Sequence, residues 1–168
     1  TPKKDSSSKL KSNSKLKSSL QKPIIAVNLK ANFNLEQASS WLKEVLKSPQ
    51  LTSNHSSQPQ LIIAAPNIFL EEFSNLISKA KLNNPPKIYA EDISSQDSGA
   101  HTGGVSAAML QGIASGTIIG HSERRLSSSE TNQIISQKVQ QALKNSLNLI
   151  LCIGSGAQDI KQHQAELY

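Results

Sequence analysis

Short apolar segments alternate with amphipathic segments from residue 23 onward, and this alternation limits the possible folds more than any other feature of the sequence. A brief, continuous apolar run is typical of a strand that is covered on both faces. Between these runs, apolar residues recur at helical spacing. We expect strands at 24–27, 61–64, 87–90, 117–120 and within 147–153. The pattern predicts a parallel sheet with right-handed β/α crossovers.

Two asparagines are predicted to begin helices. Asn34 has Gln37 three residues later, which is a variant of the capping box. Asn67 is predicted to cap the next helix, which carries apolar residues from Leu70 to Ala80. The other expected elements are a polar loop at 49–60, a short helix around 108–113, a long helix around 134–143 and the start of a further helix at 157–168.

The spacing of the strands leaves two architectures open. The five expected strand starts recur every 31 residues on average. Eight such units would need about 250 residues, the usual length of a (β/α)₈ barrel, and this chain would supply five of them. An open, doubly wound sheet is also complete with five strands. The repeat length alone therefore does not separate a partial barrel from an open sheet.

The excess positive charge is confined to the first 22 residues. Residues 1–22 contain seven Ser, seven Lys and one Asp, whereas residues 23–168 contain eleven basic and eleven acidic residues. We expect residues 1–22 to be a disordered tail, because they offer too little apolar surface to offset the entropy of ordering. A polyanion-binding arm and a targeting segment are the alternatives for the tail. The remaining domain, 23–168, gives no electrostatic reason to bind nucleic acid or membrane.

Several classes of protein are disfavoured by composition. No apolar run approaches the roughly 18–20 residues that span a bilayer. The single cysteine, Cys152, excludes a disulfide scaffold and a multi-cysteine zinc site, and we interpret it as a small buried residue. His55 and His163 lack metal-ligand spacing. Without a signal peptide, a cytoplasmic location is expected, or an organellar one if the tail is a transit segment.

Two of the expected strands end in residues that can carry chemistry. In parallel α/β folds, sites lie at the carboxyl ends of the strands. Asn28 and Lys30 follow the first strand, where a cation and an amide could hold an anionic substrate; a solvated rim lysine is the alternative. His121 follows the fourth strand, at the start of a short helical turn that disfavours the protonated imidazole. His121 is therefore either a neutral donor to a carbonyl or a structural cap beside Glu123.

Several segments together resemble the triosephosphate isomerase family. Residues 24–32, IIAVNLKAN, look like its first strand with the Asn-x-Lys motif, and residues 99–103 resemble its third loop. Residues 120–125, GHSERR, match its His motif completely. Residues 137–139 and 152–154 fall in the right order and spacing, so that the resemblance covers 23–168. It implies a partial TIM (β/α)₈ barrel made of the first five β/α units.

The resemblance also implies an activity and roles for individual residues. The expected reaction is the interconversion of dihydroxyacetone phosphate and D-glyceraldehyde 3-phosphate in glycolysis and gluconeogenesis, through an enediolate. This family is the standard case in which a neutral His acts as electrophile and a Glu acts as base beneath a closing loop. His121 would be the electrophile, Lys30 would neutralise charge, Asn28 would hold substrate, and Glu123 would lie beside Lys30. No metal or organic cofactor is implied, because two side chains suffice for the proton transfer.

The sequence departs from the family in two respects. The family's catalytic Glu follows its sixth strand, and no such segment occurs before Tyr168, so we expect a fragment that is inactive alone. A non-catalytic or split-barrel fragment that acts by association with a complementary half is the alternative. A homodimer through the third loop is also implied. Here Gly104 replaces the usual Glu, and Glu91-Asp92 replaces Gln-Asn, which alters the charge at that contact.

Overall fold

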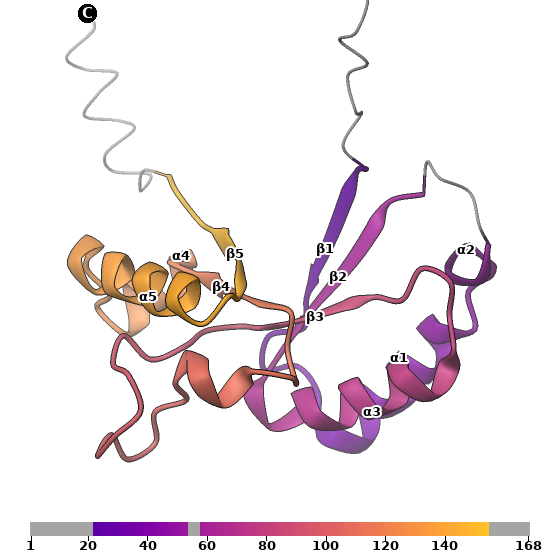
Figure 1. Ribbon diagram of the computed structural model, residues 1–168, viewed down its shortest axis with the longest axis horizontal. Coiled ribbons are helices and arrows are strands. Elements are labelled where there is room, and N and C mark those ends of the chain that lie inside the picture. The colour runs from indigo at the N-terminus through magenta and orange to yellow at the C-terminus, as the bar shows by residue number, and fades with distance from the viewer. Residues whose placement is uncertain (1–21, 54–57, 155–168) are drawn as a thin grey trace, which may run out of the picture.

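The core of the molecule is a parallel five-stranded sheet with its strands in sequence order. The structure, a computed structural model, describes residues 22–53 and 58–154; the expected final helix and all but the last residue of the expected tail lie outside these ranges. Figure 1 shows the sheet curling, with the helices on its outer side. The strands are β1 (Ile24–Asn28), β2 (Gln60–Ala65), β3 (Lys87–Ala90), β4 (Gly116–Ile119) and β5 (Asn148–Leu151).

The strand order decides between the two architectures that the repeat length left open. Each strand pairs in parallel with the next one along the chain, from β1 to β5. A doubly wound sheet would place its first strand in the interior and reverse direction there. Sequential order with curling is the arrangement of a barrel wall. The chain therefore folds as a curled half-barrel, and the expectation of a partial TIM barrel is confirmed.

The helical segments follow the predicted order, with differences in type and length. The α-helices are α1 (Leu35–Leu46), α2 (Pro49–Thr52), α3 (Leu70–Ala80), α4 (Ser122–Ser127) and α5 (Asn132–Lys144), and the 3₁₀ turns are η1 (Asn67–Phe69) and η2 (Ala107–Leu110). The expected polar loop at 49–60 thus contains one helical turn, which Pro49 starts at its first position. The expected short helix around 108–113 is only a 3₁₀ turn, and Gly112 follows it with φ +77°.

The two predicted helix caps have different outcomes. The capping box of α1 is confirmed, because Asn34 Oδ1 accepts from the Gln37 N–H at 2.9 Å and Gln37 Oε1 accepts from the Asn34 N–H at 3.0 Å. The prediction that Asn67 caps a helix is wrong. The Phe69 N–H instead donates to the Pro66 carbonyl at 2.9 Å, which closes a 3₁₀ turn and moves the start of α3 to Leu70. Pro66 favours this tight turn because its φ is fixed.

Apolar side chains form two clusters on opposite faces of the sheet. The larger cluster packs the outer face against the helices and includes Phe73 and Leu42, both fully buried. The smaller cluster lies on the inner face, where Ile62, Tyr89 and Ile118 come from three adjacent strands. This alternation follows from the two-residue period of a strand. Cys152 packs against the inner cluster as a small hydrophobic residue would, but it is half-buried rather than buried as predicted.

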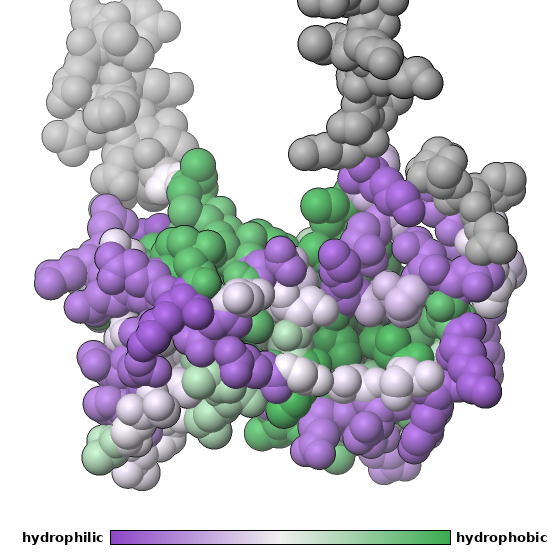
Figure 2. Space-filling view, in the orientation of Figure 1, coloured by the Kyte–Doolittle hydropathy of each residue, from purple (hydrophilic) through white to green (hydrophobic). Residues whose placement is uncertain are grey.

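The two edge strands leave apolar surface uncovered. Ile24 and Ile25 of β1 are 65% and 51% exposed, and Ile153 after β5 is 84% exposed. Figure 2 shows hydrophobic surface on both sides of the opening between these strands. Within the described ranges β1 pairs only with β2, and β5 pairs only with β4. In the same ranges, no helix has the length and apolar character that a membrane span requires.

We expect a polypeptide of residues 1–168 alone to self-associate. Unpaired strand edges with exposed apolar residues act as templates for pairing between chains. Size-exclusion chromatography with light scattering should give species larger than one chain, and their size should rise with concentration. A monomer at all concentrations that unfolds in one cooperative transition would contradict this expectation.

Candidate active site

Lys30 projects from a strained turn at the carboxyl end of β1. Its backbone has φ +52°, in the left-handed region that non-glycine residues rarely adopt. Two hydrogen bonds stabilise this turn: the Lys30 N–H donates to Asn28 Oδ1 at 3.1 Å, and Asn32 Nδ2 donates to the Leu29 carbonyl at 2.8 Å. Asn28 therefore contacts the Lys30 backbone directly. Strain that is held by local hydrogen bonds is typical of functional positions.

Glu123 connects Lys30 to the end of β4. The Lys30 ammonium donates to Glu123 Oε1 at 2.7 Å, although 93 residues separate them in sequence. Glu123 Oε2 lies 3.6 Å from His121 Nδ1. Hydrogen bonding from Lys30 lowers the pKa of the Glu123 carboxyl, so this carboxylate is ionised near neutral pH. The structure thus brings together Lys30 and His121, which the sequence predicted separately, and places Glu123 between them.

His121 is the N-cap of α4 and has a defined tautomer. Its Nδ1 accepts a hydrogen bond from the Glu123 backbone N–H at 3.3 Å. Because Nδ1 accepts in this contact, the ring hydrogen is assigned to Nε2, from which it can be donated to an acceptor. Of the two alternatives that the sequence presented, the structure shows the structural cap, and the capping contact uses Nδ1 rather than Nε2.

Gly120 and Arg125 fix the backbone that presents His121. Gly120 has φ +75°, a backbone conformation that disfavours a side chain. An added Cβ would also lie only 3.0 Å from Arg125 Nη2. Arg125 donates from Nε to the Gly120 carbonyl at 2.8 Å and from Nη2 to the Cys152 carbonyl at 3.1 Å. One guanidinium therefore joins the ends of β4 and β5 through its planar set of donors.

A cluster of four charged side chains lies next to this site; Lys138 and Glu130 are buried in it, whereas Arg124 is 43% exposed. Lys138 Nζ is 2.6 Å from both Asp92 Oδ1 and Glu130 Oε1, and Arg124 Nη2 is 2.9 Å from Asp92 and 2.8 Å from Glu130. Burial raises the pKa of Asp92 despite these cations. Burial also acts on Glu130, but hydrogen bonds from Lys138 and Arg124 outweigh it and lower the pKa of that carboxyl. The four charges balance, as buried charges must.

Sequence reasoning did not identify this cluster. One signal was available: buried Ile135, Lys138 and Ala142 lie at helical spacing on α5, so a lysine occupies an apolar stripe. Such a lysine predicts a buried acidic partner. The partners themselves, Asp92 and Glu130, lie in the segments after β3 and after α4, and only the fold shows that these segments approach α5.

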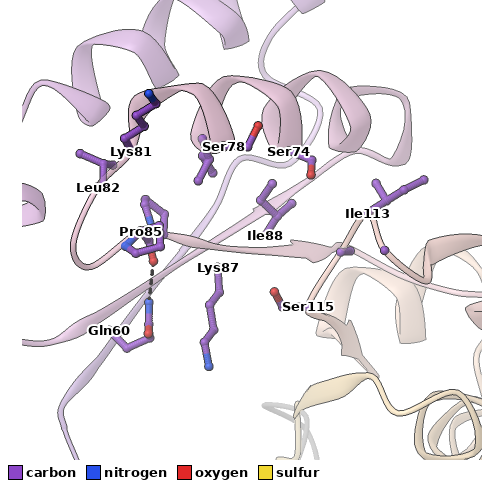
Figure 3. Close-up of a pocket in the computed structure, with 14 residues that line it drawn as sticks. Gln60, Ser74, Ser78, Lys81, Leu82, Pro85, Lys87, Ile88, Ile113 and Ser115 are labelled. Atoms are coloured by element: carbon purple, nitrogen blue, oxygen red, sulfur yellow. Dashed lines mark hydrogen bonds between the residues drawn. The ribbon is translucent and has the colours of Figure 1, made fainter.

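A groove lies at the opposite end of the sheet. It measures about 560 Å³ and is lined by the starts of three strands, including Gln60, Lys87 and Ser115. Figure 3 shows Gln60 donating to the Pro85 carbonyl at this rim, at 3.1 Å. Amino-end rims of parallel barrels serve stability, whereas chemistry lies at the carboxyl ends. Within residues 22–53 and 58–154, no three His, Cys, Asp or Glu side chains gather as metal ligands would.

Comparisons with known proteins agree on one family. The family model for triosephosphate isomerase matches residues 23–167. The triosephosphate isomerase of Leifsonia xyli subsp. xyli is 32% identical over 144 residues, which is 85% of this chain and 55% of that protein. The enzyme of the same name from Bacteroides fragilis (strain YCH46) is 38% identical over 136 residues, 80% of this chain and 51% of its own. The chain thus spans about half the length of these relatives.

A solved structure shows the same arrangement. The crystal structure of triosephosphate isomerase from Bartonella henselae superposes with a TM-score of 0.72 at 28% sequence identity. The match covers 85% of this chain and 56% of that one.

Proposed function

Because the chain belongs to the triosephosphate isomerase family, we propose that its residues form the amino-terminal part of an enzyme that interconverts dihydroxyacetone phosphate and D-glyceraldehyde 3-phosphate. The observation that carries this proposal is the contact of Lys30 with Glu123, which brings Lys30 and His121 to one rim. The rim lies at the carboxyl ends of parallel strands, where barrel enzymes bind substrate.

The proposal gives each group a task in this reaction, and the contacts described above support it. His121 donates from Nε2 to the carbonyl oxygen of the substrate and stabilises the negative charge that develops there. The Lys30 ammonium offsets the charge of the phosphate and of the enediolate. Asn28 holds the Lys30 backbone in its left-handed turn and so aims the ammonium. Proton abstraction itself is assigned to the family's Glu, which follows the sixth strand.

A homodimer through the third loop is part of the same proposal. Residues 98–104 of this loop are all exposed. Three backbone hydrogen bonds shape it: Ser94 N–H to Val105, His101 N–H to Gly99 and Gly104 N–H to His101. The loop is thus available to a second subunit. Sedimentation of the barrel described next would test the dimer.

The test of the proposed function uses a completed barrel. The completed barrel is a chimera: residues 1–168 are joined to the C-terminal portion of the Bacteroides fragilis relative that the chain does not match. A coupled assay should detect isomerisation of both triose phosphates. A folded barrel, judged by circular dichroism and cooperative unfolding, that gives no turnover would contradict the proposal.

Lys30→Met in the completed barrel should raise KM and lower kcat together. The substitution removes a charge that faces both bound substrate and the transition state, so ground-state binding and the chemical step both suffer. Met has a similar length and no β-branch, so the strain at φ +52° is unchanged. Steady-state kinetics at fixed ionic strength measures both constants.

Lys43→Met is the matched control, because Lys43 is an exposed residue of the outer helix α1. It should leave both constants within a few-fold of the parent. If Lys30→Met also left KM unchanged, Lys30 would be a solvated rim residue with no part in binding.

A further inference from the structure

Glu91 lies directly after β3, beside the proposed substrate site, and it has an unusual environment. Its Oε1 is buried and finds no hydrogen-bond partner among residues 22–53 and 58–154. A buried, unpaired carboxylate oxygen is costly, and the cost falls when the carboxyl takes up a proton. The family usually has Gln at this position, which is uncharged at every pH.

Among residues 22–53 and 58–154, the charged groups that face Glu91 come from the turn after β1 and from α4. The turn after β1 contributes Lys30, through both its backbone and its ammonium, and α4 contributes Glu123. The adjacent Asp92 is held in the cluster of four charged side chains by Lys138 and Arg124. The neighbouring end of β2 is Ala64-Ala65, which carries no charge.

The charge of this group of side chains depends on Glu91. With Glu91 neutral, the Lys30 ammonium and the Glu123 carboxylate cancel. With Glu91 ionised, two carboxylates face one ammonium, and the net charge is negative. A phosphate monoester carries about −1.5 to −2 charges at pH 7 and would be repelled by this second state.

We infer that Glu91 is a positioning residue that acts in its neutral form, so that binding of the phosphorylated dianion at Lys30 is coupled to protonation of Glu91. The inference rests on the proposed function for the identity of the dianion. Burial raises the pKa of the Glu91 carboxyl, and the nearby Glu123 adds to this effect. Hydrogen bonding from the Lys30 backbone and the positive charge of Lys30 lower this pKa, but the net shift remains upward.

The direction of the pH effect follows from the sign of the shift. A carboxyl with a raised pKa stays neutral to higher pH, so substrate should bind better on the acidic side and more weakly as pH rises through the Glu91 pKa. In the limit where only the neutral form binds, KM rises about tenfold per pH unit above that pKa. Glu91→Gln keeps the shape and removes the titration.

The kinetic test compares the completed barrel with its Glu91→Gln variant from pH 5 to 9. The ratio of their KM values cancels the ionisation of the substrate phosphate itself. We expect the KM of the parent divided by that of Glu91→Gln to rise at least about threefold from pH 5 to 9. Glu71 is an exposed glutamate on α3, so Glu71→Gln should show the same pH dependence as the parent. A ratio that stays flat overturns the inference, even if both proteins are active isomerases.

A binding test separates this inference from the proposed activity. Carboxyl ¹³C NMR of the barrel, with the Glu91 signal assigned by its loss in Glu91→Gln, should give a midpoint above the ordinary glutamate range. Sulfate, which stays a dianion throughout, should raise that midpoint further. If both shifts occur without turnover, the coupling holds and the proposed activity fails. An ordinary midpoint, or one that sulfate does not move, overturns the coupling.

Discussion

A polypeptide of residues 1–168 alone should catalyse no isomerisation above the uncatalysed rate. In the proposed mechanism His121 polarises the substrate carbonyl and Lys30 neutralises negative charge, but neither removes the carbon-bound proton. The family assigns that step to a Glu after the sixth strand. Since enzymes typically gain at least about 10⁶-fold over the uncatalysed reaction, the completed barrel should exceed the 168-residue polypeptide by that order. The coupled assay, run in both directions on equal molar amounts, measures the difference.

Adding the missing portion in trans provides the informative control. The exposed edges at Ile24 and Leu151 are suited to strand pairing with a complementary half. If separately produced halves regain activity on mixing, the split-barrel alternative for this chain is supported. Turnover by residues 1–168 alone, near that of the completed barrel, would contradict the assignment of proton abstraction to a residue outside them.

The succession of elements could be predicted from sequence because it depends on local patterns. Continuous apolar runs, helical spacing and the capping box at Asn34 act over a few residues and are preserved in the structure. The choice between barrel and open sheet could not be predicted from these patterns, because it depends on which strand lies beside which. The Asn67 cap failed for a different, local reason: the preceding Pro66 starts a 3₁₀ turn that competes with a cap.

The candidate site also combines features that local patterns predict with contacts that only the fold shows. Lys30 and His121 were predicted because each follows an apolar strand, and parallel strands share one carboxyl rim. The contact of Lys30 with Glu123 crosses 93 residues, and that of Lys138 with Asp92 crosses 46. No local pattern indicates a contact between residues so far apart in the sequence. The resemblance supplied the first pair, while the second emerged only from the fold.

His121→Gln in the completed barrel should lower kcat by about 10²–10³, the usual cost of losing one preorganised donor to a developing oxyanion. The imidazole is held by its Nδ1 contact with the Glu123 N–H, which fixes the ring and leaves the proton on Nε2. Gln retains a donor on a longer, freely rotating side chain, so orientation is lost rather than hydrogen-bonding capacity. KM should change little, because the interaction strengthens as the enediolate forms.

The control for this substitution must separate chemistry from folding, since His121 also caps α4. Thermal unfolding of the variant should show a loss of no more than a helix cap is worth, about 0.5–2 kcal/mol. His55→Gln, a change of the same type in the segment that precedes β2, should retain the parent kcat. A variant that loses rate only in proportion to its unfolded fraction would make His121 a structural cap. A kcat within a few-fold of the parent, in a fully folded variant, would contradict the electrophile role, because the fixed Nε2 donor would then contribute nothing to the transition state.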